Sequence, residues 1–302
     1  MNYTKELAEN TKDPKILTEI LKDGNNDDIS WIAANNPNCP PEILAEILRK
    51  EKKDSVSCGA IQNPNCPSEM LVEVLRRGND DRVSRVAASN PNCPKEMLVE
   101  ILKRGNNDHV SSYASANPNC PSEMLIEVLR RGKDDKVSRN AACTKNCPSE
   151  ILVEVLKRGK DDWVSCYAAG NPNCPPEILA EILKRGNKGW LSNGAAANIN
   201  CPKEILVEIL KRGNDDSVSC YAVRNPNCPQ EILVEVLKRG KNDTISYNAA
   251  VNPNCPYEAK INWMMKVGKI VKEDPKKHII EYEKIKEDNF QDLKDLLKNF
   301  DL

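Results

Sequence analysis

Asn171-Pro172-Asn173-Cys174-Pro175-Pro176-Glu177-Ile178-Leu179 is the stretch that decides the fold, because close copies of it recur along most of the chain. Every copy holds a cysteine followed by proline, and successive cysteines lie 27 residues apart, at Cys39, Cys66, Cys93, Cys120, Cys147, Cys174, Cys201, Cys228 and Cys255. Self-similarity at a fixed period is typical of repeat proteins, in which each repeat packs mainly on its neighbours. We therefore expect one elongated all-α solenoid of about ten repeats.

A single repeat predicts a helix, a turn, a shorter helix and a second turn. In one copy, Pro202 suits the first position of a helix, with Cys201 or Asn200 as its cap. The apolar residues of this helix cover about 200° of the helical wheel, as expected for a helix buried on two sides. Gly213 is placed to end it in the left-handed conformation. The acidic turn that follows offers caps for a second helix over residues 217–224, which the sequence leaves open as α or 3₁₀.

The two ends of the chain depart from the repeat pattern. We expect residues 1–10 to form an N-terminal cap, residues 11–256 the repeats and residues 257–302 a C-terminal helical cap. Within the last segment, Pro275 is expected to break a first helix. Apolar residues at helical spacing then predict two more helices, at Ile279, Ile280, Tyr282 and Ile285 and at Phe290, Leu293, Leu296, Leu297 and Phe300.

The overall charge, the apolar runs and the cysteine positions limit the class of protein. The 44 basic and 45 acidic residues give a net charge of −1, so no overall basic excess points to nucleic acid or an anionic membrane. No apolar run approaches the length of a membrane span and the first residues do not resemble a secretory leader, so we expect neither a membrane span nor a secretory signal. Cysteines at equivalent positions of stacked helices lie about 10 Å apart, too far to be bridged. We expect free thiols and a cytoplasmic protein.

The repeated phrase resembles the leucine-rich repeat variant family. The resemblance rests on Asn-Pro-Asn-Cys-Pro-x-Glu-Ile-Leu, an acidic turn and Val-Ser-x-x-Ala-Ala, and it covers roughly residues 11–256. It implies a right-handed superhelix in which an α-helix pairs with a short second helix. The 27-residue repeat is longer than the family's usual one, and the clustered cysteines that hold an iron–sulfur cluster in one member are missing. Because the family has no single activity, the resemblance implies a scaffold.

Four positions of the second helix vary freely between repeats, whereas the Val, Ser and Ala positions hardly change. In the copy described above the variable positions are Ser217, Cys220, Tyr221 and Arg224, and a helical wheel places them opposite the constant ones. The 36 variable positions hold seven of the 11 Trp and Tyr residues, and five Lys or Arg against one Asp. Aromatics and arginine are enriched at interfaces. This composition favours a recognition face over idle drift of an exposed surface.

The residues at the variable positions also change in character from one part of the chain to another. Arg82, Arg85, Lys136 and Arg139 form a basic band around His109 and Tyr113 that would suit carboxylate or phosphate. Trp163, Tyr167 and Trp190 form an aromatic block next to Asn193 that would suit an apolar or stacking partner. The predicted ligand-binding face comprises Trp31, Arg82, Arg85, His109, Tyr113, Lys136, Arg139, Asn140, Trp163, Tyr167, Trp190, Asn193, Tyr221, Arg224, Tyr247 and Asn248.

The residues disfavour an enzyme and a cofactor. With only two histidines, His109 and His278, the chain offers neither a nucleophile–base pair nor a histidine-rich metal site, and we expect no catalytic residue, metal or cofactor. The leading interpretation is a monomeric scaffold that binds a protein or an extended peptide through the variable face. The alternative is a repeat protein that reads RNA or DNA with a few side chains per repeat. No membrane partner is expected.

Overall fold

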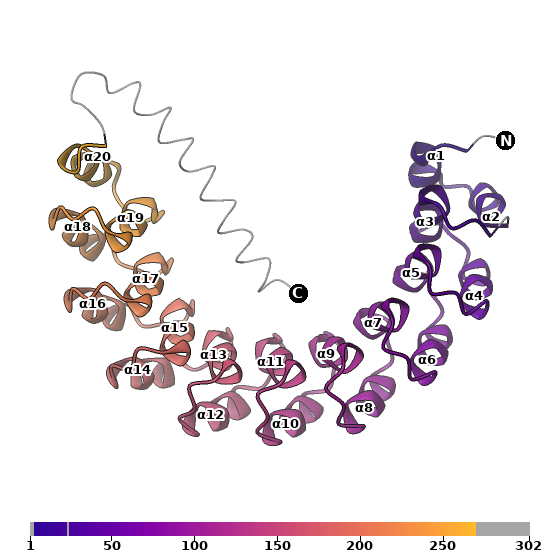
Figure 1. Cartoon of the computed structure of the whole chain (residues 1–302), viewed down its shortest axis with the longest axis horizontal. Helices are drawn as coiled ribbons and strands as arrows, with labels where there is room; N and C mark the ends of the chain where they lie inside the picture. Colours follow the sequence, from indigo (N-terminus) through magenta and orange to yellow (C-terminus); the bar gives the residue numbers. More distant parts are fainter. Residues whose placement is uncertain (1–2, 23, 270–302) are drawn as a thin grey trace. The chain divides into compact units, whose positions relative to one another are not determined.

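The computed structural model describes residues 3–22 and 24–269, and all regular structure within them is α-helical (Figure 1). By its contacts the chain divides into an N-terminal unit, residues 1–146, and a C-terminal unit, residues 147–302. Each unit is a stack of helix pairs, which confirms the predicted all-α solenoid architecture. The handedness and the total number of repeats stay predictions.

The N-terminal unit begins with helix α1 (Lys5–Asn10), which is followed by pairs of a first and a second helix. These pairs are α2 (Pro14–Lys22) with α3 (Asp28–Asn35), α4 (Pro41–Arg49) with α5 (Ser55–Gln62), α6 (Ser68–Arg76) with α7 (Arg82–Ser89), α8 (Lys95–Lys103) with α9 (His109–Ala116), and α10 (Ser122–Arg130) with α11 (Lys136–Cys143).

The C-terminal unit continues the same pairing and ends with helix α20 (Tyr257–Lys266). Its pairs are α12 (Ser149–Lys157) with α13 (Trp163–Gly170), α14 (Pro176–Lys184) with α15 (Trp190–Ala197), α16 (Lys203–Lys211) with α17 (Ser217–Arg224), and α18 (Gln230–Lys238) with α19 (Thr244–Val251). Helix α20 packs on α18 and α19, as α1 packs on α2 and α3 at the other end. The predicted helices after Pro275 lie outside the described residues.

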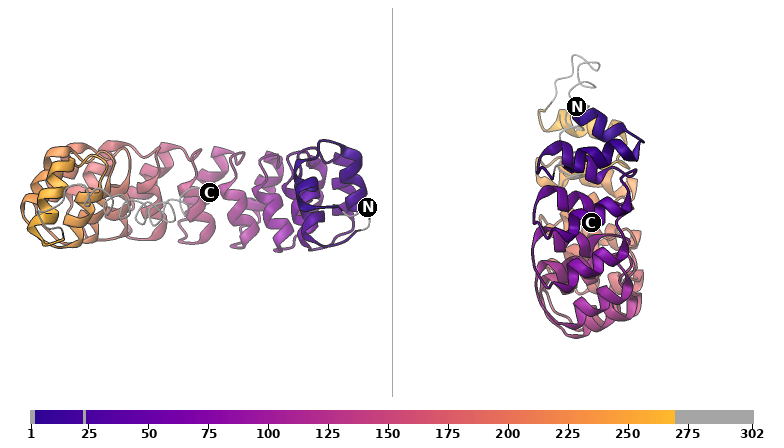
Figure 2. Two further views of the ribbon diagram at one scale, coloured as in Figure 1. Left: turned by 90° about the horizontal axis from the view of Figure 1, so that it is seen from above. Right: turned by 90° about the vertical axis from the view of Figure 1, so that its right-hand side faces the viewer.

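Within each unit the helices form two layers, one of first helices and one of second helices (Figure 1). Each second helix packs on the first helix of its own repeat and on the second helices of neighbouring repeats in the same unit. The helices run across the direction in which the repeats follow one another (Figure 2). Side chains at equivalent positions of successive second helices therefore form rows. In the part of the chain that the structure describes, no helix has the length and apolar character needed to span a membrane.

The first helix starts one residue later than the sequence suggests. Pro202 is the N-cap of α16, with φ −60° and ψ 136°, and makes no side-chain capping bond, so the predicted cap by Cys201 or Asn200 is wrong. The reason is the extended ψ of the proline, whose carbonyl accepts the first helical bonds from Ile205 N at 3.1 Å and Leu206 N at 3.2 Å. Gly213, with φ 69°, ends the helix as predicted.

The second helix is α rather than 3₁₀, and an aspartate fixes where it begins. Asp216 caps α17 because its side chain accepts a hydrogen bond from Ser219 N at 2.9 Å, three residues later. The same arrangement begins the other second helices, with the exception of α15, at Asp27, Asp54, Asp81, Asp108, Asp135, Asp162 and Asp243. The acidic turns are therefore helix caps.

The first asparagine of each Asn-Pro-Asn-Cys-Pro stretch joins one repeat to the next. Asn225 is buried, and its Nδ2 donates to Ala196 O and Asn198 O of the preceding repeat, both at 2.8 Å. Its Oδ1 accepts from Asn227 N at 2.8 Å. Equivalent donations to the preceding repeat come from Asn36, Asn63, Asn90, Asn117, Asn198 and Asn252. These asparagines form a row of hydrogen bonds between repeats, the asparagine ladder. The same stretch also joins the second helix of one repeat to the first helix of the next.

The repeated cysteines are structural. All nine are buried, and the 13 cysteines of the chain are free thiols, as predicted. Burial raises the pKa of the Cys174 and Cys201 thiols to about 12, because removal from water disfavours the thiolate. A thiol that stays protonated at neutral pH is a poor nucleophile. This row of cysteines therefore fills space between repeats.

Candidate functional site

The variable positions of the second helices are exposed to different degrees. The first variable position opens the helix after its aspartate or glycine cap, and it is exposed in every described second helix. The residues at this position are Asp28, Ser55, Arg82, His109, Lys136, Trp163, Trp190, Ser217 and Thr244. The other three positions include exposed, half-buried and fully buried side chains. The helical wheel therefore predicted the exposure of the first variable position correctly, and it overstated the exposure of the other three positions.

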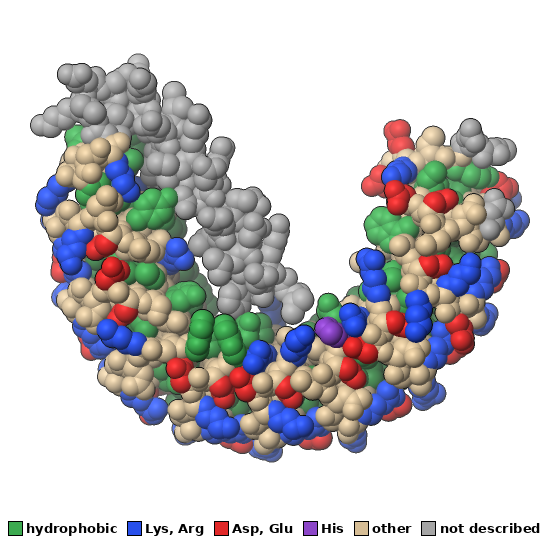
Figure 3. All heavy atoms as spheres, in the orientation of Figure 1, with side chains coloured by type: hydrophobic (Ala, Val, Ile, Leu, Met, Phe, Trp, Pro, Cys, Tyr) green, Lys and Arg blue, Asp and Glu red, His purple; other side chains and the backbone are tan. Residues whose placement is uncertain are grey.

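An aromatic cluster lies on the second-helix layer of the C-terminal unit, formed by Trp163, Tyr167 and Trp190. The ring centroids of Trp163 and Trp190 are 4.3 Å apart with an interplanar angle of 32°, and those of Trp163 and Tyr167 are 6.2 Å apart. Trp163 remains 37% exposed and Trp190 47% exposed. Hydrophobic side chains gather over α13 and α15 in Figure 3. The cluster joins residues of two repeats into one apolar surface.

Close packing of α13 and α15 brings the two indoles together. Gly194 allows this approach, because a Cβ at this position would overlap the carbonyl oxygen of Cys166. Gly59 has a similar role in the N-terminal unit, where a Cβ would lie 2.9 Å from Trp31 O. Both glycines occupy the third variable position. Variation at this position therefore partly reflects helix spacing, whereas the helical wheel predicts that all four variable positions belong to one recognition face.

Two predicted members of the ligand-binding face are not accessible. Asn193 is 8% exposed and Asn248 is 1% exposed, so the prediction that they lie on an exposed face is wrong. A helical wheel treats each helix alone, whereas neighbouring second helices cover the flanks of this face. Asn193 Oδ1 and Asn248 Nδ2 are buried without a hydrogen-bond partner. Asn140, half-buried, donates from Nδ2 to Ser112 O at 3.0 Å and links α11 to α9.

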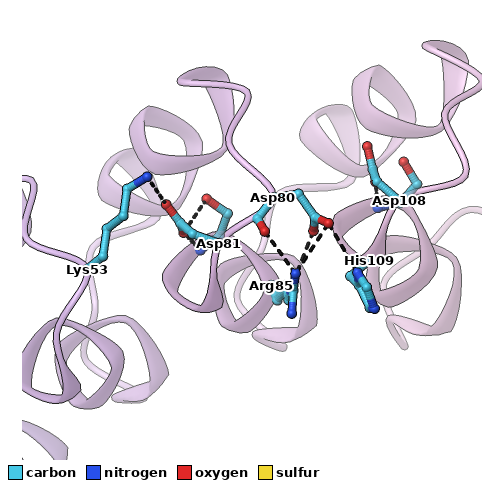
Figure 4. Close-up of polar contacts among 8 residues, drawn as sticks. Lys53, Asp80, Asp81, Arg85, Asp108 and His109 are labelled. Atoms are coloured by element: carbon cyan, nitrogen blue, oxygen red, sulfur yellow. Dashed lines mark hydrogen bonds and ion pairs between the residues drawn. The ribbon is translucent and has the colours of Figure 1, made fainter.

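The basic band is partly neutralised by aspartates of the turns. Arg85 Nε lies 3.1 Å from Asp80 Oδ1, and Arg85 Nη2 lies 3.3 Å from Asp80 Oδ2 (Figure 4). Arg139 holds Asp134 in the same way, at 2.9 Å and 3.1 Å. Half of the band's four cations are thus engaged by carboxylates five residues earlier. The expectation that the whole band is available for a carboxylate or phosphate ligand is too broad.

Asp80 also binds His109 of the following repeat. His109 Nδ1 lies 3.1 Å from Asp80 Oδ2 (Figure 4). Desolvation raises the pKa of the Asp80 carboxyl, but hydrogen bonds from Arg85 and His109 and the charge of Arg85 outweigh it, and the pKa falls to about 2. His109, placed by the sequence on the ligand-binding face, therefore has a structural contact between repeats.

Replacing Arg85 with alanine is expected to raise the Asp80 pKa from about 2 toward the ordinary value of 3.8. Because the folded pKa is depressed, the stabilisation by this carboxylate is complete above pH 3.8 and is lost as the pH falls toward 2. The carboxyl pKa would be measured by NMR titration of the full chain. Arg82→Ala, which removes a neighbouring charge outside the ion pair, should leave the titration nearly unchanged. An Asp80 pKa near 3.8 in the unmodified protein would contradict the assignment.

The remaining predicted residues lie along the same layer. Trp31 and Tyr113 are each 37% exposed, and Arg224 is exposed. Tyr221 and Tyr247 are half-buried, and the Lys269 ammonium lies 5.1 Å from the centre of the Tyr247 ring. The aromatic cluster differs from these residues in that it joins three rings, two of which are more than a third exposed.

Comparisons of the chain with known proteins found no relative. No protein-family model, curated protein or solved structure matches the chain. Among residues 3–22 and 24–269, no three His, Cys, Asp or Glu side chains are grouped as a metal site would need. The fold and the variable layer together define a helical repeat protein, and its function has to be inferred from that layer.

Proposed function

We propose that this protein is a non-enzymatic scaffold that binds a segment of another protein, in extended conformation, along the variable layer of its second helices. The observation that carries the proposal is the aromatic cluster of Trp163, Tyr167 and Trp190, with its tryptophans 37% and 47% exposed. Large aromatic side chains grouped on a surface are typical anchors of protein interfaces. We place the protein in the cytoplasm as a monomer, where its free thiols would stay reduced.

The dimensions of the layer suit an extended peptide. Successive second helices at about 10 Å advance by roughly the length of three extended residues. The four second helices of the C-terminal unit would then accompany about ten residues of a partner, with the aromatic cluster near one end. Each repeat would contact about three residues of the peptide, so differences between repeats would translate into sequence preference.

Nucleic acid is the weaker candidate. A protein that follows a phosphate backbone needs repeated cations along its surface. In the N-terminal unit, Arg85 and Arg139 are held by aspartates, which leaves Arg82 and Lys136 as the exposed cations of the basic band. In the C-terminal unit, the described second helices carry a single charged residue, Arg224. The charge pattern therefore favours a protein segment.

A displayed library of random peptides, selected against the full chain, tests the proposal. Selected peptides should lose at least about 100-fold in affinity when Trp163, Tyr167 and Trp190 are together changed to serine, because aromatic hot spots contribute about 2 kcal/mol or more each. The matched control is Ile199→Ser with Tyr257→Ser, which removes large hydrophobic residues that are 49% exposed outside the second helices. Circular dichroism would verify that both variants remain folded.

Two outcomes would count against the proposed function. One is that selected peptides bind the triple-serine variant as well as the unmodified chain. The other is that no peptide is selected while RNA or DNA binds with steep salt dependence and loses affinity on Arg82→Ala and Lys136→Ala. The second result would favour the nucleic-acid alternative.

A further inference from the structure

Four turns carry an aspartate at the same position of the repeat, Asp80, Asp134, Asp161 and Asp215. In two of these turns the residue five positions later is an arginine, Arg85 or Arg139, and it binds the aspartate with two nitrogens. The Nη2 atom of each arginine also donates to the backbone oxygen of the same aspartate, at 2.9 Å and 3.3 Å. The turn and the start of the second helix thus form a site for a guanidinium group.

Asp161 and Asp215 keep the carboxylate and lack the arginine, and only Asp161 has an aromatic residue, Trp190, 29 residues later, where Asp215 has Thr244. The residue five positions after Asp161 is Cys166, and Asp161 makes no ion pair with any residue that the structure describes. Its Oδ1 accepts a hydrogen bond from Leu191 N at 2.9 Å, which fixes the carboxylate at the start of α15. Gly189, the N-cap of α15, makes room for it, because a Cβ there would overlap the Asp161 carboxylate. The carboxylate is therefore held in place with acceptor capacity to spare.

The surroundings of Asp161 supply a second group that binds a guanidinium. Trp190 follows Asp161 by 29 residues, the spacing that separates His109 from Asp80, and it is 47% exposed. An exposed aromatic plane and a carboxylate match the flat cationic surface and the N–H groups of arginine.

We propose that this site, formed by Asp161 and Trp190, binds an arginine side chain of the partner peptide. The inference rests on the proposed function and specifies one residue of its ligand. The guanidinium takes the place that Arg85 and Arg139 occupy in their own repeats, donates to Asp161 and stacks on Trp190. Arginine is favoured over lysine because its planar fork can serve a carboxylate and an aromatic face together.

Short peptides with one variable residue test the site directly. Acetyl-Gly-Ser-X-Ser-Gly-amide, with X as arginine, citrulline, lysine or leucine, would be titrated into the full chain while indole fluorescence and NMR shifts are followed. The arginine peptide should bind at least about tenfold more tightly than the other three, because citrulline keeps the shape without the charge and leucine keeps only the apolar area. Asp161→Asn should remove this preference, and Asp161→Glu should restore part of it.

The protein's own repeats suggest a second variant. Cys166→Arg would place a guanidinium on Asp161 as Arg85 places one on Asp80, so it should abolish binding of the arginine peptide while the chain stays folded. The matched control is Cys166→Gln, which adds comparable length without charge and should retain most of the preference for arginine. Continued tight binding by Cys166→Arg would overturn the proposed site.

The outcomes separate this inference from the proposed function. Equal affinity of the arginine and leucine peptides, lost on Trp163→Ser and Trp190→Ser, would overturn the arginine site and leave peptide binding intact. No binding of the arginine peptide at millimolar concentration would also overturn it, whereas the proposed function is judged by the library selection. Selected peptides with an arginine at a fixed place, weakened at least about tenfold by Asp161→Asn, would support both.

Discussion

Replacing Asn225 with leucine is expected to lower the free energy of unfolding by about 3 kcal/mol or more. The side chain is 2% exposed and makes three hydrogen bonds, from Nδ2 to Ala196 O and Asn198 O and from Asn227 N to its Oδ1. Leucine has nearly the same shape and makes none of them. Ala196 O and Asn227 N would then lose their partner, whereas Asn198 O would keep the bond from Cys201 N at 3.0 Å, and each buried group without a partner costs about 1–3 kcal/mol. Urea unfolding followed by circular dichroism would measure the loss.

A substitution found in the chain itself serves as the comparison. Thr144 occupies the ladder position in the N-terminal unit, and its Oγ1 donates to Ala116 O at 3.5 Å, a longer bond than those of Asn225. Asn225→Thr should therefore destabilise the protein less than Asn225→Leu. Asn214→Ala, at an exposed turn, should change stability by about 0.5 kcal/mol or less. Equal effects of Asn225→Leu and Asn214→Ala would mean that the ladder contributes little.

Most of the fold follows from residues that act locally. Gly213 ends its helix with a positive φ and Asp216 caps the next one, and both effects depend on backbone preferences of a few neighbouring residues. The first helix was expected to start at Pro202 but starts at Lys203. The spacing of apolar residues does not reveal the extended ψ of Pro202, which makes this proline the N-cap. The asparagine ladder was missed for another reason. Its partners lie 27 and 29 residues away, so only the stacked repeats reveal them.

The site was predicted less completely than the fold. Position on a helical wheel gave the exposed first variable row, including Trp163 and Trp190. It failed for Asn193 because burial there depends on how closely α15 approaches α13, which Gly194 allows. The ion pairs of Arg85 and Arg139 could have been predicted from a local pattern in the sequence. Arg85 and Arg139 each follow an aspartate by five residues, and this shared spacing predicts a contact between the turn and the first turn of the helix.

The turn aspartates have different partners in the two units. In the N-terminal unit, turn aspartates are paired with arginines of the same repeat, so the protein satisfies its own charges. In the C-terminal unit, the equivalent Asp161 lies beside a short, uncharged Cys166 and an exposed Trp190. The same backbone arrangement therefore forms an internal ion pair in two turns of the N-terminal unit and holds a carboxylate without an arginine in the C-terminal unit.

Replacing Gly194 with alanine is expected to destabilise the protein by about 3 kcal/mol and to separate the indoles of Trp163 and Trp190. The added Cβ would overlap Cys166 O, and a backbone atom cannot move aside as a flexible side chain can. The helices α13 and α15 would have to move apart along their contact. Urea unfolding would measure the stability, and the coupled indole signal in circular dichroism would report the contact between the rings, whose centroids are 4.3 Å apart.

Gly170→Ala, in the neighbouring helix α13, is the matched control. No atom lies within 4 Å of a Cβ added at this position, so alanine should stabilise the helix by about 0.5–1 kcal/mol through its higher helical propensity. Opposite signs at Gly170 and Gly194 would show that helix spacing, and not helical propensity, decides the effect at Gly194. If Gly194→Ala were as stable as Gly170→Ala and kept the coupled indole signal, the close approach of α13 and α15 would not be what brings the two tryptophans together.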